Sequence, residues 1–137
     1  MNTIELLELV PKHKFDDSSF KRLREISEVE IKAILPGLFE WIADYNWPIA
    51  KELTEILTSF PETLQPYLKK ALSVECNDGD LKDTIIIHII PNLPRKNQED
   101  LIPELKRICE RPIVSERYGT NENAEDFLKE YRSERKR

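Results

Sequence analysis

The residues of this sequence that are best suited to recognition chemistry lie between Trp41 and Trp47. The two tryptophans enclose the polar group Asp44, Tyr45 and Asn46, and exposed aromatics beside polar groups are typical anchors of protein interfaces. A structural interpretation is also open, in which Trp47 packs between helices while Asp44 and Asn46 cap the following helix. We favour the structural interpretation, because tryptophan is on average highly buried in folded domains. The candidate binding surface consists of Trp41, Asp44, Tyr45, Asn46 and Trp47.

The histidines and cysteines do not form a catalytic pattern. No cysteine or aspartate stands at catalytic spacing from His13 or His88, the only histidines. His88 interrupts an apolar run, which favours a core or boundary position, and His13 lies between two lysines, which favours a solvated loop. Cys76 and Cys109 lack metal-binding spacing. A disulfide between them stays open, but two mostly buried free thiols are favoured.

The carboxylates also lack a catalytic or metal-binding pattern. Asn77, Asp78 and Asp80 resemble the start of a calcium loop, but no glutamate follows at the offset that such a loop needs, so we expect a plain turn. No pair of carboxylates is marked by its spacing as an acid–base couple. We therefore predict no catalytic residue, no cofactor and no metal site, and a non-enzymatic role is favoured over an enzymatic one.

Composition limits the possible partners and locations. A formal net charge of −5 over 137 residues argues against a nucleic-acid binder, which needs a basic footprint. The longest apolar run, residues 85–90, is far too short to span a bilayer. The first ten residues contain Glu5 and Glu8 and no basic segment, so they do not resemble a signal peptide. We therefore expect a cytoplasmic protein without a membrane span.

The spacing of apolar residues predicts an all-α protein. Only three glycines occur, which argues against hairpin-rich β structure. Apolar residues recur at helical spacing, and prolines or cap residues stand at several boundaries. The cap candidates are Thr3, Ser27 with Glu30 as a capping box, and Thr63. We expect one helical domain over residues 1–131 and a charged tail over 132–137. The expected helices cover residues 3–10, 20–26, 29–42, 48–60, 63–72, 81–93, 98–110 and 124–131.

Two of these helices have alternatives. Pro36 lies inside the third segment, which is therefore either one kinked helix or two helices with a break near Ala33. The isoleucine run over residues 85–90 taken alone indicates a buried strand. We favour a buried helix there, because helices flank the run and the chain offers no partner strand.

Three segments share one pattern, in which a proline follows one apolar position by two residues and precedes another by two. These segments are Ile34–Ile42, Leu64–Leu72 and Leu101–Cys109, with one further apolar helix between successive copies. Such a spacing is typical of stacked helix pairs, which bury a continuous core only together. We therefore expect a short HEAT-like, right-handed α/α superhelix of antiparallel helix pairs, with the proline in the first turn of alternate helices.

The segment from Leu35 to Leu72 resembles a bacterial family of unknown function with a HEAT-like α/α-solenoid fold. The most specific part of the resemblance is the Asn46-Trp47-Pro48 element, and the similarity continues through residues 90–94 and 105–108. Related proteins have aromatic residues near the start of the isoleucine helix, where this sequence has Asp83 and Thr84. The resemblance implies the fold and no catalytic residues.

Together these features predict a protein–protein interaction module. Stacked helix pairs offer an extended surface to another protein, and a small acidic helical protein is suited to neutralise a basic partner, as an immunity or antitoxin-like protein does. The alternative is a helical-repeat enzyme or accessory that holds a small ligand or nucleic acid in its groove. A pocket in which Asp44, Trp47 or His88 converge would favour that alternative.

Overall fold

The computed structural model describes residues 1–135, in which all regular structure is helical. The prediction of an all-α protein is confirmed. The elements in chain order are α1 (Thr3–Leu7), α2 (Phe20–Leu23), α3 (Glu28–Glu40), α4 (Ala50–Thr58), α5 (Pro61–Ala71), α6 (Gly79–Thr84), the π-helical turn η1 (Ile85–Ile89), the 3-10 turn η2 (Ile90–Asn92), α7 (Arg95–Glu110), the 3-10 turn η3 (Val114–Glu116) and α8 (Thr120–Arg135). None of the helices in this described part is long and apolar enough to cross a membrane.

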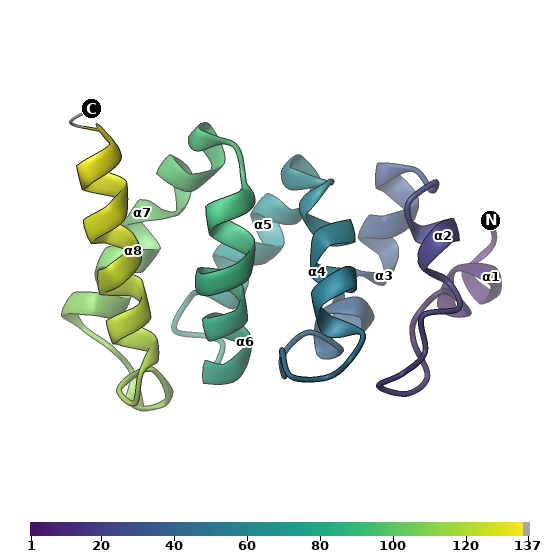
Figure 1. Ribbon diagram of the computed structural model, residues 1–137, viewed down its shortest axis with the longest axis horizontal. Coiled ribbons are helices and arrows are strands. Elements are labelled where there is room, and N and C mark those ends of the chain that lie inside the picture. The colour runs from purple at the N-terminus through teal and green to yellow at the C-terminus, as the bar shows by residue number, and fades with distance from the viewer. Residues whose placement is uncertain (136–137) are drawn as a thin grey trace.

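The helices alternate between two rows (Figure 1). The row toward the viewer contains α2, α4, α6 and α8, and the row behind it contains α1, α3, α5 and α7. Neighbours within each row pack on one another, as α3 does on α5 and α4 on η1. Short connections reverse the chain between the rows, so the loops that follow α1, α3, α5 and α7 emerge along one edge, which is the lower edge in Figure 1.

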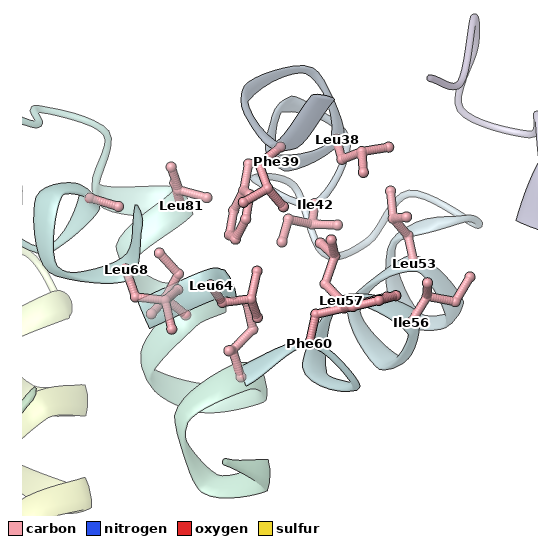
Figure 2. Close-up of a cluster of buried hydrophobic side chains, with 14 of the residues drawn as sticks. Leu38, Phe39, Ile42, Leu53, Ile56, Leu57, Phe60, Leu64, Leu68 and Leu81 are labelled. Carbon is pink, nitrogen blue, oxygen red and sulfur yellow. The ribbon is translucent and has the colours of Figure 1, made fainter. Parts of the chain in front are cut away.

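The core lies between the two rows and runs along the stack. Figure 2 shows its central part, where side chains of α3, α4, α5 and α6 meet. Leu57 and Leu64 are fully buried there, and each such side chain contributes about 1.5–3 kcal/mol relative to an exposed one. The labelled side chains are Leu38, Phe39, Ile42, Leu53, Ile56, Leu57, Phe60, Leu64, Leu68 and Leu81.

The three repeated prolines fall in one row of helices, but the prediction that they occupy first turns is wrong. Pro36, Pro66 and Pro103 lie inside α3, α5 and α7. A proline inside a helix deprives the carbonyl four residues earlier of its hydrogen bond. Here these carbonyls belong to exposed residues on the solvent side of each helix, where water can hydrate them, namely Lys32, Glu62 and Glu99. Accordingly α3 continues through Pro36, and the alternative of a break near Ala33 is also wrong.

The isoleucine run is helical, as expected, but it contains a π turn that the sequence did not predict. The Ile90 N–H donates to the Ile85 carbonyl, five residues earlier. The run packs against α4 on one side and α8 on the other, and Ile85, Ile86, Ile89 and Ile90 are all buried. Burial on two sides explains why apolar residues cover more of this helix than one amphipathic stripe would.

Several predicted helix boundaries need correction. Ser27 and Glu30 form the expected capping box of α3, whereas α5 begins at Pro61 and is not capped by Thr63. Asn2, and not Thr3, caps α1. The closing helix α8 is 16 residues long and includes Thr120–Arg135, so most of the predicted tail over residues 132–137 is helical. Residues 136 and 137 lie outside the described residues.

A buried ionic network joins the last helices. Lys82 and Glu116 are fully buried, with Lys82 Nζ 2.6 Å from Glu116 Oε2, and Arg107 forms a bidentate pair with the same carboxylate. Lys82 and Arg107 also donate to the carbonyls of Ser73 and Leu72 at the end of α5. Burial alone would raise the pKa of Glu116, but hydrogen bonds from Arg107, Lys82 and the Ile113 N–H outweigh it and lower the pKa to about 2.

Candidate functional site

The predicted recognition residues lie in the loop between α3 and α4, and part of this loop borders an open depression of about 320 Å³. Asp44, Tyr45 and Asn46 line one side of the depression. The other side comes from α6 and η1, which lie some 40 positions later in the chain and contribute Asp80, Asp83, Thr84, Ile87 and His88. Packing between helices therefore creates a site that neither segment forms alone. We refer to these lining residues as the acidic depression.

Local hydrogen bonds fix the loop against α6. The Asp44 carboxylate accepts from the Asn46 N–H at 3.0 Å, and the Asp44 carbonyl accepts from the Trp47 N–H at 3.1 Å, which closes a tight turn. The buried Thr84 hydroxyl donates to the carbonyl of Ile42 at 2.9 Å. Because Thr84 lies on α6, this bond joins the two walls of the acidic depression.

An aromatic stack covers part of the wall. The rings of Tyr45 and His88 are nearly parallel, with an interplanar angle of 9° and centroids 3.5 Å apart. Burial lowers the pKa of His88 below its ordinary value, so the imidazole is neutral at pH 7. Burial, with a smaller contribution from the charge of Glu55, raises the pKa of Tyr45. The stack therefore presents an uncharged, polarizable surface beside the carboxylates.

Three carboxylates give the depression a negative charge. Asp83 accepts a hydrogen bond from the Asn123 side chain at 3.0 Å, and Asp44 accepts one from the Asn46 backbone N–H. No ion pair within residues 1–134 involves Asp44, Asp80 or Asp83. Like charges on one concave surface raise the local concentration of cations. The arrangement is suited to attract a positively charged group.

The titratable groups of the depression were compared with the arrangements that metal binding and acid–base catalysis require. In the described part of the chain, no group of three His, Cys, Asp or Glu side chains has the geometry to hold a metal ion. The pKa of His88 responds to burial alone, without the effect of a neighbouring carboxylate. A general base is usually oriented by a second polar group, and within residues 1–134 no side chain forms a hydrogen bond with the ring of His88.

The structural interpretation of Trp47, Asp44 and Asn46 is wrong in its details. Trp47 is half-buried and rests on Trp41, with ring centroids 5.3 Å apart, while Trp41 is the one that packs against the core. Helix α4 begins at Ala50 without a side-chain cap. Asp44 and Asn46 are exposed, and they line the acidic depression together with the half-buried Tyr45. The five predicted residues therefore separate into a tryptophan pair and three lining residues.

The other residues with chemical potential are less informative. His13 is exposed in a loop, as expected, and its Nδ1 accepts from the Phe15 N–H. Both cysteines are free thiols, as favoured from the sequence. Asp78 caps α6 by accepting from the Leu81 N–H, which confirms the turn. Asp80, Asp83 and Thr84 were not predicted as site residues from the sequence. The one signal was that Asp83 and Thr84 stand where the family resemblance implies aromatic residues.

The fold and the depression together define a class: an all-helical protein whose helices stack in two rows and carry an acidic depression at the edge where the odd-numbered helices end. The family described as "Domain of unknown function (DUF5071)" matches residues 9–128. The chain belongs to this family, which agrees with the resemblance to an uncharacterised family. A comparison with curated proteins finds no match.

Proposed function

We propose that this chain is a non-enzymatic protein-interaction module whose acidic depression binds a basic side chain of another protein. The observation that supports this proposal is the convergence of Asp44, Asp80 and Asp83 around the stack of Tyr45 and His88. Charges that are complementary across an interface steer the encounter and select the partner. The overall charge of −5 favours a basic partner in the same direction.

Arginine suits the depression better than lysine does. A guanidinium is planar, stacks on aromatic rings and forms bidentate bonds with carboxylates, whereas an ammonium is a compact point charge. The neutral ring of His88 does not repel a cation at pH 7. Asp80, at the start of α6, forms no ion pair within residues 1–134, so its carboxylate can bind a guanidinium.

The same proposal includes the architecture. The two rows of helices support a short HEAT-like, right-handed α/α superhelix, in which the loop edge serves as the binding edge. An immunity or antitoxin-like role in a bacterial cytoplasm is one form of the proposal, since an acidic surface neutralises a basic toxin domain by charge complementarity.

The alternative of an enzyme or ligand-binding accessory is supported by one observation. Asp44 and His88 line the same depression, as the alternative requires. Trp47 does not line it, and the depression is open to solvent, whereas catalytic sites exclude water. We therefore rank binding above catalysis.

The proposal can be tested by comparing the proteins that co-purify with the wild-type chain and with Asp80→Asn/Asp83→Asn. Both substitutions keep shape and remove charge, and the Asn123 contact can persist with an amide. A matched control, Glu125→Gln/Glu130→Gln, removes two exposed charges from α8. We expect a stoichiometric partner that is retained by the control, is lost by the depression variant and dissociates with added salt. A partner that binds both variants equally would contradict the proposal.

A further inference from the structure

We propose that the loop over residues 111–119 is a second docking surface, which binds an acidic segment of a partner protein that also carries an apolar side chain. This loop connects α7 to α8 at the lower edge of the stack in Figure 1. Its exposed residues are Arg111, Val114, Arg117 and Tyr118. This surface goes beyond the acidic depression, because its charge is of the opposite sign and its residues are different.

The exposed side chains of the loop are unusual for a connection. Tyr118 is 89% exposed and Val114 is 66% exposed, so both leave apolar area in water. Arg111 and Arg117 are exposed in the same loop, and no ion pair within residues 1–134 involves either guanidinium. Tyrosine and arginine are the residue types that most often carry binding energy at interfaces, together with tryptophan.

Contacts of the buried residue Glu116 hold the loop over residues 111–119 in one conformation. Glu116, in the middle of the loop, is fully buried, where Lys82 and Arg107 contact its carboxylate and the Ile113 N–H donates to it at 2.9 Å. Buried ion pairs add little net stability compared with apolar packing, so such a network is better explained by the conformation that it fixes. It holds Val114 and Tyr118 on either side of an anchored residue.

Two glycines allow the same conformation. A Cβ at Gly79 would lie 2.6 Å from the Ser115 carbonyl oxygen, so only glycine lets the loop approach the start of α6 this closely. Gly119 has a φ of 122°, in the region that other residues rarely adopt, and it turns the chain directly after Tyr118. A surface that is already ordered loses less conformational entropy on binding.

The charges of the loop indicate the kind of partner. The loop has two exposed guanidinium groups together with a tyrosine and a valine, and the Arg117 Nε–H donates to the Pro112 carbonyl at 3.3 Å. Such a set is complementary to carboxylates near an apolar side chain. A nucleic acid is disfavoured, because the chain as a whole is acidic and two arginines neutralise few phosphates. An acidic, apolar-containing peptide segment therefore matches the loop in charge and in chemistry.

The test uses a phage-displayed library of random linear peptides as the probe, selected against the folded wild-type chain. We expect enrichment of peptides that combine Asp or Glu with an aromatic or aliphatic residue. The affinity of a selected peptide for Tyr118→Ala should be at least about tenfold weaker. Arg117→Ala should weaken binding and reduce its dependence on salt concentration.

Matched controls make the result specific to the loop. Val29→Ala removes another exposed apolar side chain, 81% exposed on α3, and should leave the affinity unchanged. Asp80→Asn/Asp83→Asn should also leave it unchanged, so failure here and failure of the acidic depression are distinguishable. All variants alter exposed or partly exposed residues, and thermal melting verifies that each is folded. Enrichment of basic peptides, binding that Tyr118→Ala retains, or tighter binding of a single-stranded oligonucleotide probe would overturn the proposal.

Discussion

Replacing Glu116 with glutamine tests how much the buried ionic network contributes to the free energy of unfolding. The variant keeps the shape of the side chain and removes the carboxylate that contacts both Lys82 and Arg107. The pKa of Glu116 is about 2 in the folded chain, against an ordinary value of 4.5. The difference of about 2.5 pH units corresponds to about 3 kcal/mol of interaction with the ionised form. We therefore expect Glu116→Gln to lower the free energy of unfolding by about 3 kcal/mol at pH 7.

The dependence of this effect on pH has a definite sign. A pKa that is lower in the folded state than in the unfolded state stabilises the fold above the unfolded value. The contribution of Glu116 is thus complete above about pH 5 and is lost as the pH falls toward about 2. The stability difference between wild type and Glu116→Gln should shrink over this range, because the wild-type carboxylate becomes neutral as well.

The assay is urea unfolding followed by circular dichroism at several pH values. The matched control is Glu52→Gln, because Glu52 pairs with Arg24 at 2.7 Å on the surface, where both side chains are nearly half exposed. An exposed pair of this kind contributes at most about 1 kcal/mol. A loss for Glu116→Gln no larger than that of the control, or a difference that does not change with pH, would refute the reasoning.

Three further substitutions test other parts of the structure. Gly79→Ala would normally stabilise a helix by about 0.5–1 kcal/mol, but the contact with the Ser115 carbonyl should reverse the sign and cost about 1–3 kcal/mol in urea unfolding. Thr84→Val removes the hydroxyl that donates to the Ile42 carbonyl and should lower the free energy of unfolding by about 1–2 kcal/mol, with faster amide exchange in the loop over residues 42–47. Trp47→Ala should cost less than about 2 kcal/mol, well below the roughly 2–5 kcal/mol expected for the fully buried Leu57→Ala, and equal losses in thermal melting would show that Trp47 is a core residue.

Much of the fold could be predicted because helical periodicity is a local signal. The stripe Leu53, Ile56 and Leu57 identifies α4, and Ser27 with Glu30 marks the start of α3 by its capping box. The positions of the prolines could not be predicted in the same way. Proline is favourable in the first turn of a helix, which is why the sequence predicts first-turn positions for these prolines. A proline in the helix interior is tolerated where the carbonyl four residues earlier is exposed to water. The choice between a first-turn and an interior position depends on whether that carbonyl is buried, and the local sequence does not show this.

The site was only partly predictable, because half of it comes from another helix. Asp44, Tyr45 and Asn46 stand out as polar residues between tryptophans, whereas Asp80 and Asp83 look like ordinary surface carboxylates of a helix start. The packing of η1 on α4 and the hydrogen bond from Thr84 to the Ile42 carbonyl bring these groups to one depression. The buried network was invisible for the same reason, since Lys82 and Glu116 are 34 residues apart and both belong to residue types that are rarely buried.

The central claim, that the acidic depression binds a basic side chain, is tested most directly by an NMR titration. The isotopically labelled chain is titrated with a short arginine peptide, and a glutamate peptide of the same length serves as control. The account predicts shifts of the amide signals around Tyr45, Asp80, Asp83 and His88 that weaken with salt and disappear in Asp80→Asn/Asp83→Asn. Shifts concentrated on α8, shifts that persist in that variant, or no shifts at all would contradict the account.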